Sequence, residues 1–311
     1  MINKKSKIFV AGHRGMIGSA ILRKLNELNY KKIYFRSKNQ LDLTNQTKVY
    51  KYFKKIKPDA VILAAAKVGG IKANNEKRGE FIYENLAIQN NVIDSSFKNG
   101  VKNLIFLGSS CVYPKNCKIP IKESYLLSNY LEKTNEPYAI AKIAGINLCE
   151  SYNIQYGVNY KCLMPCNAYG INDNYDINNS HFFPALIRKI INALENNKSY
   201  IKIWGSGKPL REMIFCDDVA DACIYFLNKK TKHSLINIGT GVEKSINEYA
   251  RYIMSHLGVN LEIKRENVKL DGTYRKLMDL SIAKKYGWKF KTNLDLGLSI
   301  TINDYLKKKD K

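Results

Sequence analysis

Three evenly spaced glycines near the N-terminus constrain the fold of this chain more than any other feature. Gly12, Gly15 and Gly18 follow a short apolar run at Lys7–Ala11 and open a stretch whose apolar residues have helical spacing. A strand, a glycine turn and a helix in this order are typical of the first unit of a parallel α/β sheet. Glycine lets the backbone approach a pyrophosphate closely, and the helix N-terminus offers free N–H groups. An ordinary tight turn is the alternative. We expect a dinucleotide loop formed by Gly12, His13, Arg14, Gly15, Met16, Ile17 and Gly18.

The rest of the first half alternates short apolar runs with amphipathic stretches. This alternation is typical of βαβ units in a parallel sheet that is covered on both faces. It predicts an α/β protein with a Rossmann-type doubly wound parallel sheet. Strands are expected at 7–11, 32–35, 60–64, 103–107 and 160–164, and helices at 17–28, 47–57, 81–97 and 138–156.

The pattern loosens after residue 170, which indicates a second, smaller unit. Helices are expected at 180–195, 217–227, 245–257 and 294–308, with a strand at 235–238. We therefore predict a dinucleotide-binding domain over residues 1–170, rejoined by about 217–245. A smaller C-terminal substrate-binding lobe is predicted over 171–216 and 246–311.

The chain is strongly basic, with a formal net charge of +24 from 51 Lys+Arg against 27 Asp+Glu. Such an excess raises the alternative of nucleic-acid binding. The lysines are scattered, however, and the longest basic cluster is Lys307–Lys309. We interpret most of the charge as solvated surface that also favours an anionic ligand such as a nucleotide, and we expect no nucleic-acid partner.

Location and cysteine chemistry are constrained by simple counts. No stretch approaches the length of about 18 apolar residues that a membrane span needs. The apolar run behind the basic start, Ile8–Ala11, is too short for the core of a signal peptide. The seven cysteines are odd in number and contain no C-x-x-C pair. We therefore expect a cytoplasmic protein with neither a disulfide framework nor a metal site.

The residues after the second expected strand indicate which dinucleotide is bound. NAD enzymes usually place an acidic residue there for the ribose 2′-hydroxyl. This chain has Arg36 and Lys38 instead, and Arg14 lies inside the glycine turn. Cations pair with a 2′-phosphate that a carboxylate would repel. The sequence therefore favours NADP(H), with ordinary surface cations as the alternative.

A tyrosine and a lysine four residues apart, Tyr138 and Lys142, share one face of the helix expected at 138–156. A neighbouring ammonium favours the phenolate, so we expect Lys142 to lower the Tyr138 pKa toward the working range. Tyr138 can then give a proton to a carbonyl oxygen as hydride reaches the carbon. Ser109, just after the fourth strand, is placed to bond that carbonyl.

Several segments together resemble the GDP-L-fucose synthase family of extended short-chain dehydrogenases/reductases, over nearly the whole chain from Ile8 onward. The resemblance implies NADPH-dependent 3,5-epimerisation and 4-reduction of GDP-4-keto-6-deoxy-D-mannose to GDP-L-fucose, in a homodimer. The segments are Ala11–Gly18, Ala64–Ile71, Leu107–Pro114, Asn135–Gly145, Asn179–His181, Trp204–Gly207 and Asp271–Thr273.

The same resemblance assigns roles to individual residues. A 4-keto group acidifies the protons on C3 and C5, and the family's cysteine and histidine that move them match Cys111 and His181. A thiolate is a competent base and histidine titrates near neutral pH. The resemblance implies cofactor contacts from Leu107, Gly108, Ser109, Ser110, Lys142, Pro165, Cys166, Asn167, Ala168 and His181. It implies GDP-sugar contacts from Lys189, Trp204, Arg211 and Asp271.

Departures from the family pattern leave alternatives open. Lys38 stands where arginine is usual, and Cys166 and Ala168 replace a threonine and a larger apolar residue beside the nicotinamide. Smaller side chains there would suit another GDP-4-keto sugar, such as a 6-deoxy-heptose. The alternatives are therefore a C4 reductase on such a sugar, with or without epimerase activity, or a related epimerase or dehydratase. A non-enzymatic, nucleic-acid-binding protein is a third alternative, which the Tyr138–Lys142 pair disfavours.

Overall fold

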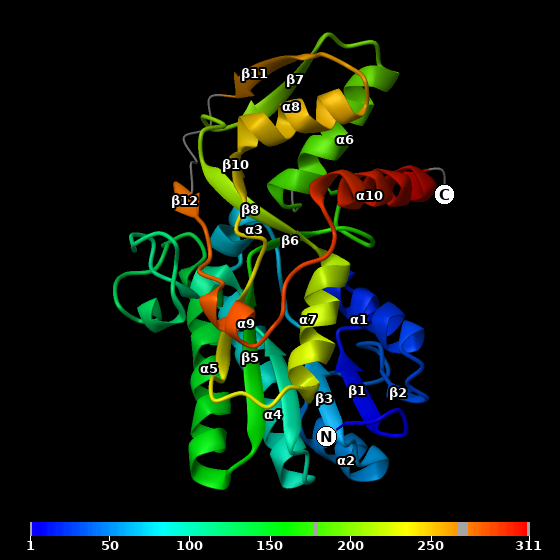
Figure 1. Ribbon diagram of the computed structural model, residues 1–311, viewed down its shortest axis with the longest axis vertical. Helices are drawn as coiled ribbons and strands as arrows, with labels where there is room; N and C mark the ends of the chain where they lie inside the picture. The colour runs from blue at the N-terminus through cyan, green and yellow to red at the C-terminus, as the bar shows by residue number, and fades with distance from the viewer. Residues whose placement is uncertain (1, 177–179, 267–272, 310–311) are drawn as a thin grey trace.

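A large parallel sheet forms the centre of the computed structural model, which describes residues 2–176, 180–266 and 273–309. Its six strands run in the order β2-β1-β3-β4-β5-β9, and each neighbouring pair is parallel. The expected Rossmann-type doubly wound sheet is therefore confirmed (Figure 1). The strands are β1 (Lys7–Ala11), β2 (Lys32–Tyr34), β3 (Ala60–Leu63), β4 (Asn103–Leu107), β5 (Asn159–Pro165) and β9 (Leu235–Ile238).

Helices cover both faces of this sheet. On one face α1 packs against α7, and on the other α4 packs against both α2 and α5. The expected helices of the first half are all present, with ends within about three residues of the predicted ones. The helices that cover the sheet are α1 (Met16–Glu27), α2 (Gln46–Ile56), α4 (Arg78–Lys98) and α5 (Glu136–Tyr156) from the first half, and α7 (Cys216–Asn228) from the second.

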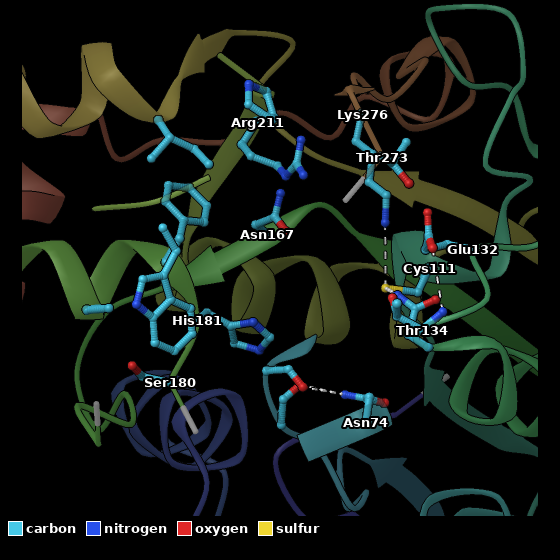
Figure 2. A pocket seen from close by; sticks show the side chains of 18 of the residues that line it. Asn74, Cys111, Glu132, Thr134, Asn167, Ser180, His181, Arg211, Thr273 and Lys276 are labelled. Atoms are coloured by element: carbon cyan, nitrogen blue, oxygen red, sulfur yellow. Dashed lines mark hydrogen bonds between the residues drawn. The ribbon is translucent and has the colours of Figure 1, made fainter. Parts of the chain in front are cut away.

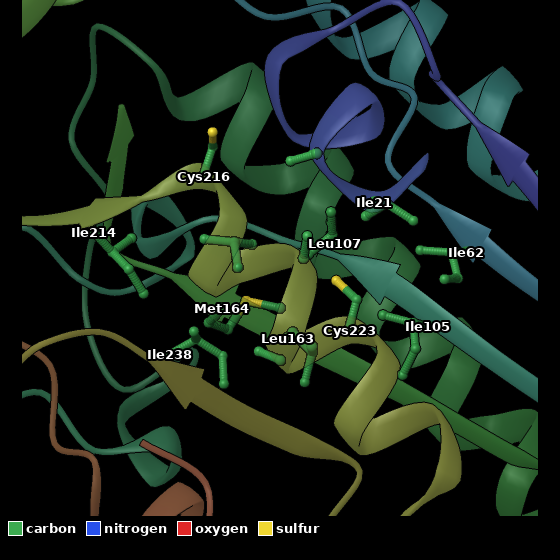
Figure 3. Close-up of a cluster of buried hydrophobic side chains, with 14 of the residues drawn as sticks. Ile21, Ile62, Ile105, Leu107, Leu163, Met164, Ile214, Cys216, Cys223 and Ile238 are labelled. Atoms are coloured by element: carbon green, nitrogen blue, oxygen red, sulfur yellow. The ribbon is translucent and has the colours of Figure 1, made fainter. Parts of the chain in front are cut away.

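The core lies between the sheet and its helices. Figure 3 shows Ile105 and Leu107 of β4 beside Leu163 and Met164 of β5, with Cys223 of α7 packed over them. All are at most 5% exposed. Strands that are buried on both faces need apolar side chains at successive positions, and this is why the sequence showed them as continuous apolar runs. Burying each such side chain contributes about 1.5–3 kcal/mol.

A smaller lobe lies beyond one end of the large sheet (Figure 1). Its main sheet has the order β10-β8-β12, with β6 also paired to β8, and β7 pairs with β11. None of these strands was predicted from the sequence. Their bounds are β6 (Asn167–Tyr169), β7 (Tyr200–Trp204), β8 (Leu210–Phe215), β10 (Glu243–Ser245), β11 (Glu262–Glu266) and β12 (Arg275–Lys276).

Three longer helices complete the lobe, and α6 packs against both α8 and β7. They are α6 (Phe182–Glu195), α8 (Ile246–His256) and α10 (Leu294–Lys309). Short helical segments are α3 (Ile71–Glu76), η1 (Ser110–Val112), η2 (Glu123–Tyr125) and α9 (Ser281–Lys285). The residue limits proposed for two domains stay a prediction. No helix in the described ranges is long and apolar enough to cross a membrane.

The chain enters the small lobe directly from the large sheet, because β5 ends at Pro165 and β6 begins at Asn167. The carboxyl ends of the parallel strands therefore face the lobe. Ligands of open α/β sheets bind outside these carboxyl ends. The fold therefore predicts a ligand site between the large sheet and the small lobe.

Candidate active site

The glycine turn has the geometry of a pyrophosphate cradle. Gly12 has φ +88°, and a Cβ there would lie 2.6 Å from the Ala65 backbone nitrogen. A Cβ on Gly18 would overlap the carbonyl oxygen of Gly12, so α1 packs as closely as glycine allows. Gly15 precedes α1 without a side-chain cap. The first N–H groups of α1 are therefore open to an anion.

The cationic side chains expected to bind the 2′-phosphate lie beside this turn, since Arg36 and Lys38 follow β2, the neighbour of β1. Both are exposed, as is Arg14. The Arg36 guanidinium donates to the Phe35 carbonyl at 2.7 Å and lies 5.2 Å from the centre of the Tyr52 ring. The Lys38 ammonium is 3.8 Å from the nearest Glu84 oxygen. Exposed cations held this loosely remain available to a 2′-phosphate.

Within the same turn, His13 stacks on Phe35 with ring centroids 4.6 Å apart. Burial lowers the pKa of His13, and the charge of Arg14 lowers it further. The ring therefore adds no second positive charge beside Arg14 at neutral pH. Met16 and Ile17 are the first two residues of α1 and are partly buried.

The Tyr138–Lys142 pair lies in the first two turns of α5. The Lys142 ammonium donates to the Leu107 carbonyl at 2.8 Å and lies 5.9 Å from the Tyr138 ring centre. Lys142 is only 3% exposed, and burial lowers its pKa to about 8. This arrangement joins the helix to the end of β4.

The predicted lowering of the Tyr138 pKa is wrong for these side chains. Burial raises the pKa of Tyr138, because the phenolate loses hydration, and the nearby Cys111 side chain raises it further. A hydrogen bond with the Ser109 side chain opposes this effect without outweighing it. Tyr138 is thus held as a protonated phenol, which is the form that donates a proton.

Ser109 and Cys111 follow β4 at the carboxyl edge of the sheet. The Ser109 hydroxyl accepts from the Cys111 backbone N–H at 3.3 Å, which begins η1. The Cys111 sulfur accepts from Asn135 Nδ2 at 3.3 Å and from Lys276 Nζ at 3.7 Å. Figure 2 shows Lys276 pointing at this sulfur from the small lobe.

The residues next to Ser109 pack inside the protein. Gly108 faces the Met164 thioether so closely that a Cβ would overlap it. Ser110 is buried at 4% exposure, and Leu107 at 5%. These residues bring the backbone of the β4 end close to the glycine turn, because β4 and β1 both pair with β3.

His181 reaches the pocket from the opposite side, as the residue before α6. The side chain of His181 is open to the pocket, but the protein around it reduces its hydration and so lowers its pKa, and the positive charge of Lys276 lowers it further. The imidazole is therefore favoured in its neutral form, which can accept a proton. Lys276 acts on both His181 and Cys111, although the sequence did not single it out.

One pocket of about 300 Å³ unites most of the predicted catalytic and substrate residues. Lys189 Nζ lies 5.3 Å over the Trp204 ring and donates to the Lys202 carbonyl at 2.8 Å. Trp204 is 41% exposed. Asp271, the fourth predicted GDP-sugar residue, lies outside the described residues. The predicted residues that line the pocket are Ser109, Cys111, Tyr138, Asn167, His181, Lys189, Trp204 and Arg211.

The β5–β6 junction lies at the back of the site. Asn167 lines the pocket, and its amide donates to the Glu212 carbonyl at 3.0 Å. Cys166 is 5% exposed and its N–H donates to the Ile238 carbonyl at 2.8 Å, while burial raises the pKa of its thiol. Pro165 ends β5. Cys166 and Ala168 are not among the described residues that line the pocket.

Sequence reasoning missed Lys276, Asn135 and Asn74, which all line the pocket. Asn135 had a usable signal, because it stands at the N-cap position of α5, three residues before Tyr138. Asn74 is 7% exposed and donates to the Gly69 carbonyl at 2.7 Å, but nothing in its local sequence marks it. Glu132, Thr134, Ser180 and Thr273 also line the pocket (Figure 2).

The doubly wound sheet, its glycine turn and the Tyr–Lys pair define a nucleotide-dependent dehydrogenase of the short-chain type. A family model described as the NAD dependent epimerase/dehydratase family matches residues 8–239. The chain belongs to that family.

Relatives narrow the resemblance. GDP-L-fucose synthase 1 of Arabidopsis thaliana is 49% identical over 99% of this chain and 95% of the relative. GDP-L-fucose synthase of Escherichia coli (strain K12) is 44% identical over 99% and 98%. A solved structure of GDP-mannoheptose C4 reductase from Campylobacter jejuni, with NADP bound, superimposes with a TM-score of 0.90. It shares 40% identity, with 98% of this chain and all of that chain covered.

Proposed function

We propose that this protein converts GDP-4-keto-6-deoxy-D-mannose to GDP-L-fucose by 3,5-epimerisation and NADPH-dependent 4-reduction. One observation carries the proposal: Cys111, Tyr138 and His181 line the same pocket as Lys189 and Arg211. Two proton-transfer groups, a proton donor for the ketone and two phosphate-binding cations are thereby combined. The identity to GDP-L-fucose synthases over nearly the full chain supports the same reaction.

The cofactor assignment rests on the glycine turn and its cations. The Gly12–Gly18 geometry fits a pyrophosphate, and Arg14, Arg36 and Lys38 suit a 2′-phosphate. The structural relative with NADP bound supports the same choice. When bound, NADPH supplies hydride to the sugar C4. The Lys142 side chain and the 165–168 junction would border its ribose and nicotinamide.

Epimerisation needs a base and an acid on opposite faces of the sugar. The Cys111 thiolate takes a proton from a carbon beside the ketone; the C–H electron pair forms a C=C bond to the carbonyl carbon, and the C=O π pair moves onto the oxygen. Ser109 and Tyr138 donate hydrogen bonds to the enolate oxygen. His181, from the other side of the pocket, takes up a proton from solvent on its neutral imidazole and delivers it to the opposite face of the carbon. The enolate recovers a proton at carbon, and the configuration is inverted.

Reduction then uses Tyr138 as the acid. Its raised pKa keeps the phenol protonated until negative charge develops on O4. The phenolic proton passes to O4 while C4 accepts hydride, and a proton from solvent restores the phenol. The buried Lys142 ammonium, 5.9 Å from the ring, stabilises the transient phenolate.

The direct test mixes the protein with GDP-4-keto-6-deoxy-D-mannose and NADPH in D₂O, follows NADPH absorbance, and identifies the product by NMR. We expect NADPH oxidation and GDP-L-fucose that carries deuterium at C3 and C5. Replacing Cys111 with serine and His181 with glutamine together should abolish deuterium incorporation while NADPH still binds. A wild-type product without deuterium at C3 and C5 would contradict the proposed epimerase activity.

A C4 reductase on a GDP-4-keto-heptose is the second candidate, favoured by the likeness to the C. jejuni reductase. The comparison is made by measuring kcat/KM for GDP-4-keto-6-deoxy-mannose and for a 6-deoxy-heptose analogue side by side. The fucose assignment requires a clear preference for the hexose. A preference for the heptose, without deuterium at C3 or C5, would favour the second candidate.

We further propose a cytoplasmic homodimer that binds no nucleic acid. The dimer is supported by exposed apolar side chains on the neighbouring helices α4 and α5, where Tyr83 is 70% exposed and Ile154 81%. Light scattering of the purified protein checks the mass. The proposed cytoplasmic location is supported by the seven cysteines, all of which are free thiols. Binding to DNA that weakens steeply with salt would contradict the last point.

A further inference from the structure

Two donors converge on the sulfur of Cys111 from different parts of the fold. Asn135 Nδ2 is 3.3 Å away and comes from the start of α5, while Lys276 Nζ is 3.7 Å away and comes from β12. A neutral thiol is only a weak hydrogen-bond acceptor, so it gains little from two donors. A thiolate is a stronger acceptor and can accept a hydrogen bond from each of them. Both donors are therefore placed where they can stabilise negative charge on this sulfur.

The other polar groups around the sulfur do not supply a positive charge. Tyr138 is a neutral phenol, the Ser109 hydroxyl is in the same loop, and Glu132 pairs with Lys115 at 2.8 Å. Across the pocket, His181 is favoured in its neutral form. Lys276 is thus the cation that contacts Cys111 among the described residues.

The position of Lys276 is fixed by the backbone that follows it. β12 pairs with β8, where Lys276 lies opposite Arg211. The next residues are held firmly: Met278 N–H donates to the buried Glu212 carboxylate at 2.8 Å, and the Leu277 carbonyl accepts from Ile121 N–H at 2.7 Å. These bonds restrict where the Lys276 side chain can start, so its ammonium is directed to the pocket (Figure 2).

We propose that Lys276 is a positioning residue whose ammonium stabilises negative charge on the Cys111 sulfur when this sulfur removes the sugar proton. The inference rests on the proposed function, since it concerns the base of the proposed epimerisation. Asn135 adds a neutral hydrogen bond to the same atom. Lys276 therefore supports proton removal without itself contacting the reacting carbon.

The test measures thiolate reactivity in the free, full-length protein with iodoacetamide as the probe. Cys117 is first replaced with serine, because it is the other partly exposed cysteine and the remaining five are buried. In that background, Lys276→Met should slow alkylation of the Cys111 peptide at pH 7 about fivefold to tenfold and move its pH profile upward. Lys276→Arg, which keeps the charge, should restore most of the rate.

A matched control removes another cation from the same pocket. Lys189→Met should leave the alkylation rate of Cys111 unchanged, because the Lys189 ammonium lies over Trp204 and bonds the Lys202 carbonyl. Thermal unfolding of each variant checks that the fold is retained. Equal alkylation rates and pH profiles for wild type and Lys276→Met would overturn the inference.

A second measurement separates this role from substrate binding and from the proposed function. Lys276→Met should lower the maximal rate of deuterium exchange at C3 and C5 about tenfold, with KM nearly unchanged. A raised KM with normal alkylation would make Lys276 a substrate contact instead. If the wild type exchanges no deuterium yet alkylation still depends on Lys276, the pairing stands and the epimerase assignment fails.

Discussion

The pocket has two walls that differ in origin and in chemistry. The sheet wall, formed by Ser109, Cys111, Asn135 and Tyr138, comes from one short stretch of chain between β4 and α5. The lobe wall comes from four separate elements of the small lobe and consists of His181, Lys189, Trp204, Arg211 and Lys276. Apart from Cys111, the sheet wall carries neutral hydroxyl and amide groups, whereas the lobe wall carries three cations, an indole and an imidazole.

Because the walls differ in this way, the two reactions depend on different parts of the pocket. Reduction of C4 needs only the sheet wall and the cofactor turn beside it. Epimerisation needs both walls, because Cys111 and His181 lie on opposite sides and Lys276 contacts Cys111 across the pocket. Proton exchange should therefore be lost more easily than reduction when residues of the pocket are replaced.

The largest effect is expected at the sheet wall. Tyr138→Phe removes the acid for O4 and should lower NADPH oxidation about 10³-fold, within the range of general acid catalysis. Deuterium exchange at C3 and C5 should persist at a reduced rate, because Ser109 still bonds the enolate. Tyr130→Phe, at a tyrosine that is 83% exposed, is the matched control and should change neither rate. Equal losses of both activities would erase the distinction between the walls.

On the lobe wall, His181→Gln should lower deuterium exchange about 10²-fold, since one face of the sugar loses its proton-transfer group. NADPH affinity should change little, because the glycine turn is untouched. Fluorescence titration and NMR exchange measure the two quantities. His233→Gln, at a histidine that bonds Tyr286 away from the pocket, serves as control. Retained exchange in His181→Gln would remove the lobe wall from the proton chemistry.

Arg211→Met should act on binding rather than on turnover. Loss of a charged hydrogen bond costs about 1.5–3 kcal/mol, which corresponds to a rise in KM of about 10-fold to 100-fold. The maximal rate should be nearly unchanged, as initial rates over a range of substrate concentrations would reveal. Arg251→Met, at an exposed arginine of α8, should have no effect. A fall in kcat at constant KM would contradict a binding role.

A smaller effect is expected outside both walls, at the cofactor turn. Arg36→Ala should raise KM for NADPH about tenfold and leave KM for NADH unchanged, because only NADPH has the 2′-phosphate. Lys32→Ala, at an exposed residue of β2, the strand that Arg36 follows, controls for the general loss of positive charge. Parallel losses for both cofactors would show that Arg36 does not select NADPH.

The smallest effect concerns pH. Burial places the pKa of Lys142 at about 8, so its ammonium is present below that pH and is lost as pH rises through it. Reduction should therefore fall by about half at pH 8 and further above it. Lys142→Arg should remove this alkaline fall, since arginine stays charged; the rates of each variant are compared with its own maximal rate. An unshifted profile in Lys142→Arg would assign the fall to another group.

The same shift affects stability in a defined direction. The pKa of Lys142 is about 8 in the folded protein, below its ordinary value of 10.5, so the folded protein binds this proton less tightly than the unfolded chain does. Between about pH 8 and pH 10.5 the unfolded chain therefore holds more protons at this position, and this group's contribution to the free energy of unfolding rises with pH. Comparing denaturant midpoints of wild type and Lys142→Met across this range checks the sign.

The sheet wall was predictable from the sequence because its signals are local. Tyr138 and Lys142 are four residues apart on one helix, and β4 and β5 are continuous apolar runs. The glycine turn is likewise a short pattern between a strand and a helix. What the sequence misjudged was the Tyr138 pKa, because burial of the side chain depends on distant packing.

The lobe wall was reached only through the family resemblance, and not completely. Its strands are short and partly exposed: β12 has two residues, and the residues of β11 are all at least partly exposed. Such strands have neither a continuous apolar run nor a clean alternation. The contact between Lys276 and Cys111 joins residues 165 positions apart. No local pattern can indicate a contact of that kind.

The interleaved path of the chain has a consequence for how such enzymes diversify. The small lobe takes β6 to β8 from one stretch and β10 to β12 from another, and α7 and β9 of the large sheet interrupt them. Genetic recombination at a single junction cannot transplant this lobe intact from one relative to another. We therefore expect sugar preference to change by individual substitutions in the lobe wall and not by exchange of modules.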